Sequence, residues 1–316
     1  MVDHEEQPIL KRRRKLRLGR VLFTLFFISI LLFAIYAVIQ FSIGKNITKG
    51  FTYDVGEFEG DLLHPNYPTM ENFLLLGIDN DGSGRSRTDT MMIVSWDKSD
   101  GSIRTLSLMR DIYAEIPGYK SYKLNTAFYL DGIQLAKDTI TSMFGIPIHH
   151  YAIIDFENFE SMIDIAFPNG VEMNVQKEMS QNIGVTLMPG VQQLNGQELL
   201  GYARFRMDQE GDFGRVQRQQ EVIASLKNES TKLSTIIRSP KILGALSNFV
   251  ETDLPEKEII QKAIPLLLAK QMDVETMTIP VEGSYRYNDY AHAGSVIEID
   301  LEQNRAAIDA FLLNHQ

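Results

Sequence analysis

Residues 201–220 read GYARFRMDQEGDFGRVQRQQ and place four arginines in a chain that is acidic overall. Arg204 and Arg206 are two positions apart, so an extended backbone would point both guanidinium groups to one side. Arg215, Arg218 and Gln219 fall at i, i+3 and i+4 in the helical pattern that follows, so we expect them to share one helix face. Arginine binds phosphate oxygens through a planar fork that stays charged, which favours a clamp for a phosphate-bearing ligand. The alternative is an arginine-rich surface paired with its neighbouring carboxylates.

The composition excludes several classes of site. The 316-residue chain has no cysteine, which rules out disulfides, zinc–thiolate sites and a cysteine nucleophile. Its net charge of −10 is unevenly divided, because residues 1–20 carry +4 and the remainder carries −14. Nucleic-acid binding depends on neutralising phosphates, so the acidic body argues against a nucleic-acid partner. The Gly-x-Ser-x-Gly, Walker A and His-Glu-x-x-His motifs are absent from the sequence, which argues against a serine hydrolase, a P-loop NTPase and a zinc metalloprotease.

Residues 21–43 are apolar and contain no charged side chain. A helix of that length spans roughly 34 Å, enough for a hydrocarbon core of about 30 Å. The basic cluster precedes it, so the positive-inside rule puts the N-terminus in the cytoplasm. We therefore expect a single-pass membrane protein with a cytoplasmic tail (1–20), a transmembrane helix (21–43), a linker (44–70) and an extracellular domain (71–316). The alternative, a cleaved signal peptide, would have a shorter apolar region and a small-x-small cleavage site.

Beyond the linker, short apolar runs alternate with amphipathic segments, which predicts an α/β fold: a central mixed β-sheet between layers of helices. Strands are expected over residues 72–79, 88–96, 103–109, 151–156, 171–175 and 274–281. Helices are expected over residues 125–144, 157–167, 214–228 and 308–313, and within 232–272, where prolines 240, 255 and 265 should break them. Residues 190–195 are expected to form a loop before a helix that Asn195 caps.

The first three predicted strands place charged side chains at their ends, namely Asp79, Asp89 and the pair Arg110 and Asp111. Ligand sites of open α/β sheets lie beyond strand ends, so these side chains should meet in one crevice. Two carboxylates without a nearby histidine or cysteine suit a hard cation such as Mg²⁺. The alternative is that Asp79 and Asp89 accept hydrogen bonds from backbone amides in turns.

Several segments together are more specific than any one of them. They are NFLLLGID (72–79), RTDTMM (87–92), LMRD (108–111), KLN (123–125), DF (155–156), RFR (204–206) and GDFGRVQRQQ (211–220). In this order and spacing they resemble the LytR–CpsA–Psr family, over about residues 70–230. Known members transfer anionic glycopolymers, such as teichoic acids or capsular polysaccharide, from a polyprenyl-pyrophosphate carrier to peptidoglycan. The resemblance therefore implies a phosphotransferase at the outer face of a Gram-positive cell membrane.

The resemblance also implies roles for individual residues. Asp79 and Asp89 match Mg²⁺-binding aspartates, with Mn²⁺ as an alternative cation, and Asp212 matches an aspartate that positions arginines. The positions that match pyrophosphate contacts are Arg87, Arg110, Arg204, Arg206, Arg215, Arg218 and Gln219. The predicted catalytic set is Asp89, Arg110, Asp111, Arg206 and Asp212. The family's Pro-Arg-Asp reads Met109-Arg110-Asp111 here, which removes a rigid turn beside Arg110.

The implied reaction agrees with these residue types. Cleaving a pyrophosphate linkage spreads negative charge over phosphate oxygens, so the protein must mainly supply positioning and positive charge. A peptidoglycan hydroxyl would attack, and either Asp89 or Asp111 would accept its proton. The apolar helix faces in 125–145 and 214–228 are candidates to flank a polyprenyl groove, with core packing as the alternative. A polyprenyl-pyrophosphate hydrolase and a membrane-anchored regulator of transcription remain the competing functions.

Overall fold

A computed structural model describes residues 18–47, 55–79, 86–268 and 274–313. Its central sheet has the strand order β10–β3–β2–β1–β6–β9. The six strands are β1 (Met70–Ile78), β2 (Thr88–Asp97), β3 (Ile103–Leu108), β6 (His150–Asp155), β9 (Val250–Thr252) and β10 (Val274–Ile279). The pairs β1–β6 and β10–β3 are parallel, and β1–β2, β2–β3 and β6–β9 are antiparallel. The predicted mixed sheet is confirmed, with β10 at one edge.

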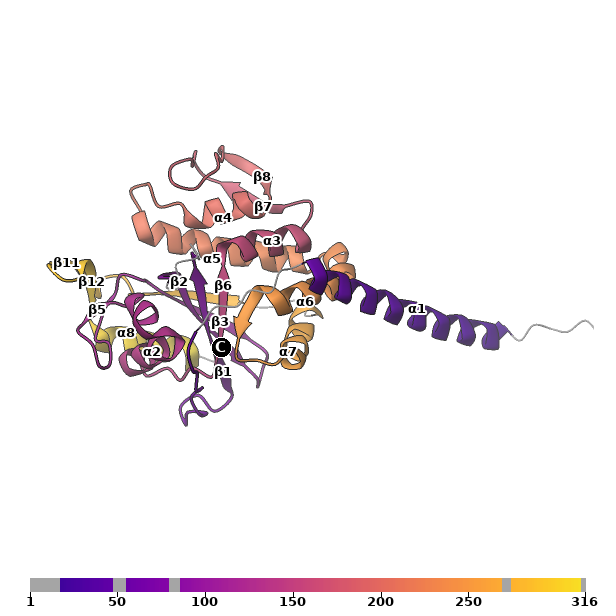
Figure 1. The fold of residues 1–316 in the computed structure, drawn as a ribbon, viewed down its shortest axis with the longest axis horizontal. Helices are drawn as coiled ribbons and strands as arrows, with labels where there is room; N and C mark the ends of the chain where they lie inside the picture. Colours follow the sequence, from indigo (N-terminus) through magenta and orange to yellow (C-terminus); the bar gives the residue numbers. More distant parts are fainter. Residues whose placement is uncertain (1–17, 48–54, 80–85, 269–273, 314–316) are drawn as a thin grey trace, which may run out of the picture.

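Helices cover both faces of this sheet (Figure 1). On one face lie α2 (Thr126–Phe144) and α8 (Leu301–Leu313); on the other lie α3 (Phe156–Ala166), α4 (Gly196–Arg204) and α5 (Gly211–Ser230). The hairpin β7 (Val171–Val175) and β8 (Gly190–Leu194) packs on the second layer. Two small sheets, β4 (Tyr113–Ala114) with β5 (Tyr122–Lys123) and β11 (Tyr285–Tyr290) with β12 (Gly294–Ile299), lie together at one end of the molecule. The fold is the predicted three-layer α/β architecture.

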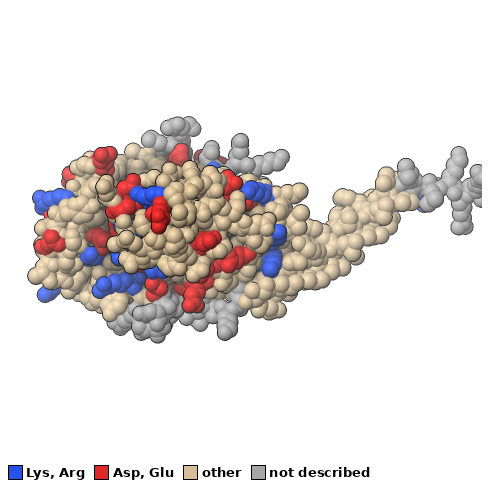
Figure 2. Space-filling model, turned by 90° about the horizontal axis from the view of Figure 1, so that it is seen from above, with Lys and Arg blue, Asp and Glu red and all other residues tan. Residues whose placement is uncertain are grey.

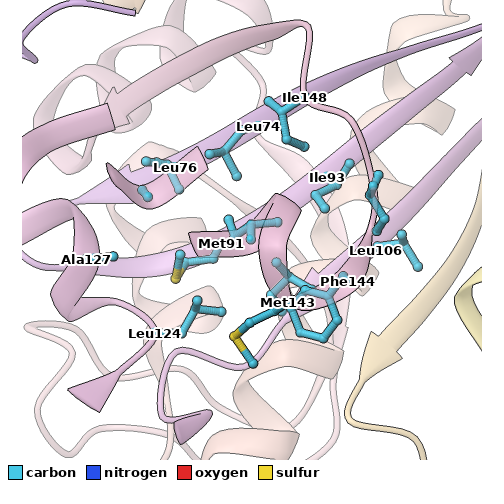
Figure 3. Close-up of a cluster of buried hydrophobic side chains, with 14 of the residues drawn as sticks. Leu74, Leu76, Met91, Ile93, Leu106, Leu124, Ala127, Met143, Phe144 and Ile148 are labelled. Atoms are coloured by element: carbon cyan, nitrogen blue, oxygen red, sulfur yellow. The ribbon is translucent and has the colours of Figure 1, made fainter. Parts of the chain in front are cut away.

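The period of two along β1 and β2 separates the two faces of the sheet. Leu74, Leu76 and Ile93 are fully buried against α2, where they meet Met143 and Phe144 (Figure 3). Burying each such side chain contributes about 1.5–3 kcal/mol relative to leaving it in water. The alternate positions of the strands face α3, α4 and α5, and this is the side on which the candidate site lies.

The N-terminal helix α1 (Leu18–Ile47) is the one described helix long and apolar enough to cross a membrane, as a membrane anchor or a signal sequence would be. It projects from the body as a rod that is apolar over most of its length, with Arg20 near its start and Lys45 in its last turn, whereas the body carries many charges of both signs (Figure 2). Its last turns pack on α6 (Leu233–Phe249) through facing glycines. A Cβ on Gly44 would lie 2.1 Å from the Lys241 carbonyl oxygen, and one on Gly244 would lie 2.1 Å from that of Phe41. The two backbones are therefore in direct contact.

Residues 55–69, within the segment predicted as a linker, pack against the domain. The Val55 carbonyl accepts a hydrogen bond from the Ile133 amide (3.1 Å), where α2 is kinked at Asp131 and Gly132. Gly132 has φ of +68°, and a Cβ there would lie 2.3 Å from the Val55 carbonyl oxygen, so this approach requires glycine. Asp61 accepts from Lys137 Nζ at 2.9 Å. This part of the predicted linker therefore contributes to the folded domain.

Three local predictions were wrong. Residues 190–194 form β8, because they complete a hairpin with β7, and not a loop. Pro240 lies inside α6, and α7 (Glu256–Leu268) runs through position 265. An interior proline removes one helical hydrogen bond, and the packing of α6 on α1, α3 and α7 holds the helix together across it. The predicted cap at Asn195 is confirmed, as part of a capping box with Glu198, and α2 is followed by Gly145 in a left-handed conformation.

A polar cluster at the edge of the sheet opposite the candidate site is centred on His150. Its Nδ1 lies 2.6 Å from Asp253 Oδ2, and its Nε2 lies 3.0 Å from Glu71 Oε1. Burial by itself lowers the pKa of His150, but the hydrogen bonds to Asp253 and Glu71 outweigh burial and raise that pKa to about 9. The cluster links β1, β6 and the segment after β9, and its role is structural.

This cluster predicts a pH dependence of stability. A histidine pKa raised by folding stabilises the folded state fully below its ordinary pKa, and the stabilisation is lost as the pH rises through about 9. The unfolding midpoint of the wild type should therefore fall between pH 6.5 and 9.5 more than that of His150→Gln. The exposed His64 provides the matched control, because His64→Gln should keep the wild-type dependence. Parallel curves for wild type and His150→Gln would contradict this assignment.

Candidate functional site

The ends of the central strands bring the predicted charged residues to one edge of the sheet. Strand β2 runs antiparallel to β1 and β3, so its first residues lie beside the last residues of both. Asp79 follows β1, Asp89 is the second residue of β2, and Arg110 follows β3. The β1–β2 pairing is irregular between Gly77 and Ile78, as is common where a strand end serves a site.

An apolar cavity of about 400 Å³ lies between this side of the sheet and the layer of α3, α4 and α5. Its apolar lining comes from Leu75, Leu76, Gly77, Met92, Ile154, Phe156, Phe159, Met162, Leu200, Ala203, Val222, Ile223 and Leu226. Its volume is in the range of small-molecule sites. The expected contribution of α5 is present, but that of residues 125–145 is not, because the apolar face of α2 is used in the core. Helices α3 and α4 take its place.

A polar cavity of about 490 Å³ adjoins the apolar one, and the two share Asp89 and Arg110 in their walls. The polar cavity is lined by Asp79, Ser86, Arg87, Asp89, Arg110, Asp111, Lys123, Asn125 and Tyr129. The shared pair defines a junction. At this junction the apolar cavity is also lined by Arg206, Arg215 and Gln219. The arrangement suits a ligand with an apolar chain and an anionic head.

Asp212 holds three arginines in place at the junction. Its Oδ2 accepts hydrogen bonds from Arg110 Nε (3.2 Å) and Arg215 Nη2 (3.0 Å), and its Oδ1 lies 3.9 Å from Arg206 Nη1. Arg110 also donates to Asp89 across the strand ends. Charge-assisted hydrogen bonds of this kind fix guanidinium groups in direction as well as in position.

The electrostatics of this network follow from its burial. Burial alone raises the pKa of Asp212, but Arg215 and Arg110 outweigh burial and bring that pKa below its usual value. Burial and the neighbouring Arg110 lower the pKa of the Arg215 guanidinium. Arg215 Nε is buried without a hydrogen-bond partner among the described residues. A buried donor without a partner calls for a ligand, and an anion would also relieve the repulsion between Arg110 and Arg215.

The remaining predicted residues lie around the same junction, with one exception. Arg204 Nη2 donates to Asp79 Oδ2 at 3.2 Å, and Arg87 stacks 5.4 Å from the Tyr129 ring. Gln219 Nε2 donates to Thr90 Oγ1 at 2.9 Å. Arg204 ends α4, so the extended geometry expected for residues 204–206 does not occur.

The exception is Arg218. Its Nη1 donates to the Phe205 carbonyl at 2.9 Å and its Nη2 donates to Asp208. It lines neither cavity, so the structure places it as a support for the α4–α5 connection. A helix face 100° wide admits residues at i, i+3 and i+4, but its two flanks can point to different neighbours. Arg215 and Gln219 face the junction, and Arg218 faces away.

The predicted donors for a cation are the carboxylates of Asp79 and Asp89. Asp79 and Asp89 both face the polar cavity, and the described residues contain no group of three or more His, Cys, Asp or Glu that could hold a metal. Mg²⁺ is bound in this way when phosphate oxygens and water complete its coordination, so the residues fit the ion. Asp79 also pairs with Arg204, and Asp89 pairs with Arg110.

Several residues of the site were missed as site residues. Lys123 pairs with Asp111 (2.8 Å), and Asn125 and Tyr129 line the polar cavity. Phe156 lies under the Arg204 guanidinium at 4.4 Å in the apolar cavity. Lys123, Asn125 and Phe156 belong to segments already noted in the sequence, and that was the available signal. Nothing in the sequence indicated that Tyr129 would line the cavity, because that depends on which turn of α2 faces the cavity.

Known proteins resemble this chain in sequence and in fold. The chain matches the LytR_cpsA_psr family over residues 49–307. It belongs to the LytR–CpsA–Psr family. It is 41% identical over 280 residues to the regulatory protein MsrR of Staphylococcus aureus, covering 88% of this chain and 85% of that protein. It is 33% identical to the polyisoprenyl-teichoic acid–peptidoglycan teichoic acid transferase TagU of Enterococcus faecalis, covering 75% and 80%. The crystal structure of B. subtilis TagV has a TM-score of 0.63 at 26% identity, covering 78% of this chain and 99% of TagV.

The network around Asp212 makes a prediction about stability. Asp212→Asn removes the charge that compensates Arg110 and Arg215, so the free energy of unfolding should fall by about 1–3 kcal/mol in chemical denaturation. Asp289, which is exposed on β11, is the matched control, and Asp289→Asn should change the free energy of unfolding by less than about 0.5 kcal/mol. If Asp212→Asn were as stable as that control, the carboxylate would not hold the arginines.

Proposed function

We propose that this protein transfers a phosphate-linked anionic glycopolymer, a teichoic acid or a capsular polysaccharide, from polyprenyl pyrophosphate to peptidoglycan. The observation that carries the proposal is the junction at Asp89 and Arg110, where an apolar cavity meets a polar one lined by charged side chains of both signs, with Arg206 and Arg215 beside it. A polyprenyl pyrophosphate has the matching chemistry, with an apolar chain next to two phosphates. The relatives named TagU in Enterococcus faecalis and Bacillus anthracis, 33% and 30% identical, support the same reaction.

The arginines position the pyrophosphate and stabilise its developing charge. Arg110, Arg206 and Arg215, held by Asp212, contact its non-bridging oxygens at the junction. Gln219 lies on the helix face of Arg215 and orients the phosphate nearer the lipid. Arg87 reaches it from the polar cavity, and Arg204 reaches it from the apolar cavity. The polyprenyl chain of the donor lies in the apolar cavity, so the phosphorus that reacts faces away from that cavity.

The reaction is a single displacement at phosphorus. An acceptor hydroxyl oxygen forms a bond to the phosphorus that carries the glycopolymer, the bond from that phosphorus to the bridging oxygen breaks, and polyprenyl monophosphate leaves. Asp79 and Asp89 would hold Mg²⁺, or Mn²⁺, which would neutralise charge on the phosphate oxygens. A carboxylate bound to a cation is a weaker proton acceptor, so Asp111 takes the hydroxyl proton. Lys123, 2.8 Å from Asp111, orients that carboxylate.

Helix α1 serves in this proposal as a single-pass anchor, with the N-terminus in the cytoplasm and the domain outside. The apolar residues of α1 are exposed over most of its length, and the contact with α6 holds the domain next to its end. A membrane-bound donor is therefore within reach of the apolar cavity. The domain that follows α1, with its charged site, lies on the outer side of the membrane, where peptidoglycan is located.

Two other functions remain as outcomes of the test. Water could replace the acceptor, which would make the protein a pyrophosphate hydrolase. The similarity to the regulatory protein MsrR favours a regulatory role for this protein. It would have that role either through its action in wall synthesis or without taking part in wall synthesis. A regulator without catalysis would bind the lipid donor and leave it intact.

The test uses the full chain in detergent with a polyprenyl-pyrophosphoryl oligosaccharide, Mg²⁺ and soluble peptidoglycan fragments, with products followed by mass spectrometry. A sugar–phosphate adduct on the fragments is expected, and Asp89→Asn should reduce its rate at least about a hundredfold. Asp100→Asn, an exposed change in the turn after β2, is the control and should retain the wild-type rate.

Three results would contradict parts of this proposal. Polyprenyl monophosphate without an adduct would indicate hydrolysis. Bound but unconsumed donor would indicate a regulator. A near-normal rate in Asp89→Asn would remove that carboxylate from catalysis.

A further inference from the structure

A third cavity extends the polar one away from the apolar cavity. It has a volume of about 510 Å³ and shares Arg87, Lys123 and Tyr129 with the polar cavity. The remaining residues in its wall are Tyr119, Lys120, Tyr122, Thr126, Leu130, His292 and Ala293. We call it the aromatic cavity. The three cavities therefore form one continuous series, with the junction at Asp89 and Arg110 between the first two.

The aromatic cavity is built from rings and cations held by two small sheets. Tyr122 lies on β5 and packs edge-on against His292, with ring centroids 5.3 Å apart. His292 Nε2 lies 3.0 Å from the Ser121 carbonyl oxygen, which holds the loop after β11 against β5. Tyr119 and Tyr129 are 47% and 37% exposed, so their rings are accessible to a ligand. Lys120 is exposed and forms no ion pair with any other residue in the described part of the chain.

This combination is suited to a sugar chain with acidic groups. The face of an aromatic ring is electron-rich and attracts the polarised C–H groups of a pyranose. Hydroxyl and amide groups of the sugar bond to Thr126 and to the tyrosine hydroxyls, and a carboxylate is attracted to Lys120. A polyprenyl chain would instead require a dry apolar wall, which this cavity lacks.

The direction of attack decides which sugar chain lies there. In phosphoryl transfer the attacking and leaving oxygens are roughly in line. The leaving phosphate lies toward the apolar cavity, so the attacking hydroxyl must approach from the polar cavity on the opposite side. The glycopolymer of the donor is attached to an equatorial oxygen and leaves sideways from that line. The aromatic cavity lies beyond the polar cavity, on the acceptor's side.

We infer that the aromatic cavity binds the acceptor glycan, an acidic amino-sugar chain of peptidoglycan, and presents its hydroxyl to the polar cavity. This inference rests on the proposed function. It gives Tyr119 and Lys120 a binding role and Asp111 a short path to the attacking hydroxyl, since Asp111 lines the polar cavity and pairs with Lys123, which the polar and aromatic cavities share.

The experiment measures acceptor binding and donor turnover separately in the full-length protein. The acceptor probe is a soluble tetrasaccharide of alternating N-acetylglucosamine and N-acetylmuramic acid without stem peptides, so that its lactyl carboxylates are free, and its binding is followed by saturation-transfer NMR. Tyr119→Ala and Lys120→Ala should each raise the KM for this probe about tenfold, the loss of roughly 1.4 kcal/mol. Tyr119→Phe, which keeps the ring and loses only the hydroxyl, should have a KM closer to that of the wild type than to that of Tyr119→Ala, and Lys257→Ala on the exposed start of α7 is the charge control.

The outcomes separate this inference from the proposed function. An unchanged KM and unchanged probe binding in Tyr119→Ala and Lys120→Ala would overturn the acceptor site. A raised KM for the lipid donor with an unchanged acceptor KM would assign the cavity to the donor glycopolymer and also overturn it. If the wild type consumed no donor but bound the probe in a Tyr119-dependent way, the acceptor site would stand and the transfer reaction would fall.

Discussion

The carboxylate of Asp212 is the contact on which the site depends. Three arginines of like charge, two of them largely buried, would repel one another at the edge of the sheet without it. Asp212 stands in the first turn of α5, and Arg110 follows β3, so this contact also joins the helical layer to the sheet. It holds the layers together beside the apolar cavity that lies between them, and the proposed lipid-linked donor requires both the cavity and the arginines next to it.

The position of that cavity explains the division of labour between the two sheet faces. One face is filled by α2 and α8 and supplies stability through closely packed Leu, Ile, Met and Phe side chains. The other face retains a cavity beneath α3, α4 and α5, and its polar end is lined by residues from strand ends. Site residues on rigid strand ends and helix turns are held more closely than residues on loops. The arginine side chains are therefore in position before any ligand binds.

Much of this could be predicted from the sequence, and the failures have physical reasons. Strand ends with Asp79, Asp89 and Arg110 predict a common crevice because side-chain period and sheet geometry are local rules. The opposite orientation of Arg218 and the use of α2 for the core depend on tertiary packing, which spacing alone does not contain. Tyr129 lines the polar and aromatic cavities because the first turns of α2 lie beside β5. Pro240 was tolerated because contacts between helices outweighed a local propensity.

The central claim is that one continuous site holds a polyprenyl chain in the apolar cavity and its pyrophosphate at the junction. The most direct measurement is a structure of the full chain in detergent with a short-chain polyprenyl pyrophosphate bound. We expect both phosphates among Arg110, Arg206 and Arg215, with the chain between Leu75 and Val222. Phosphates bound elsewhere, or a chain that leaves the apolar cavity empty, would contradict the account.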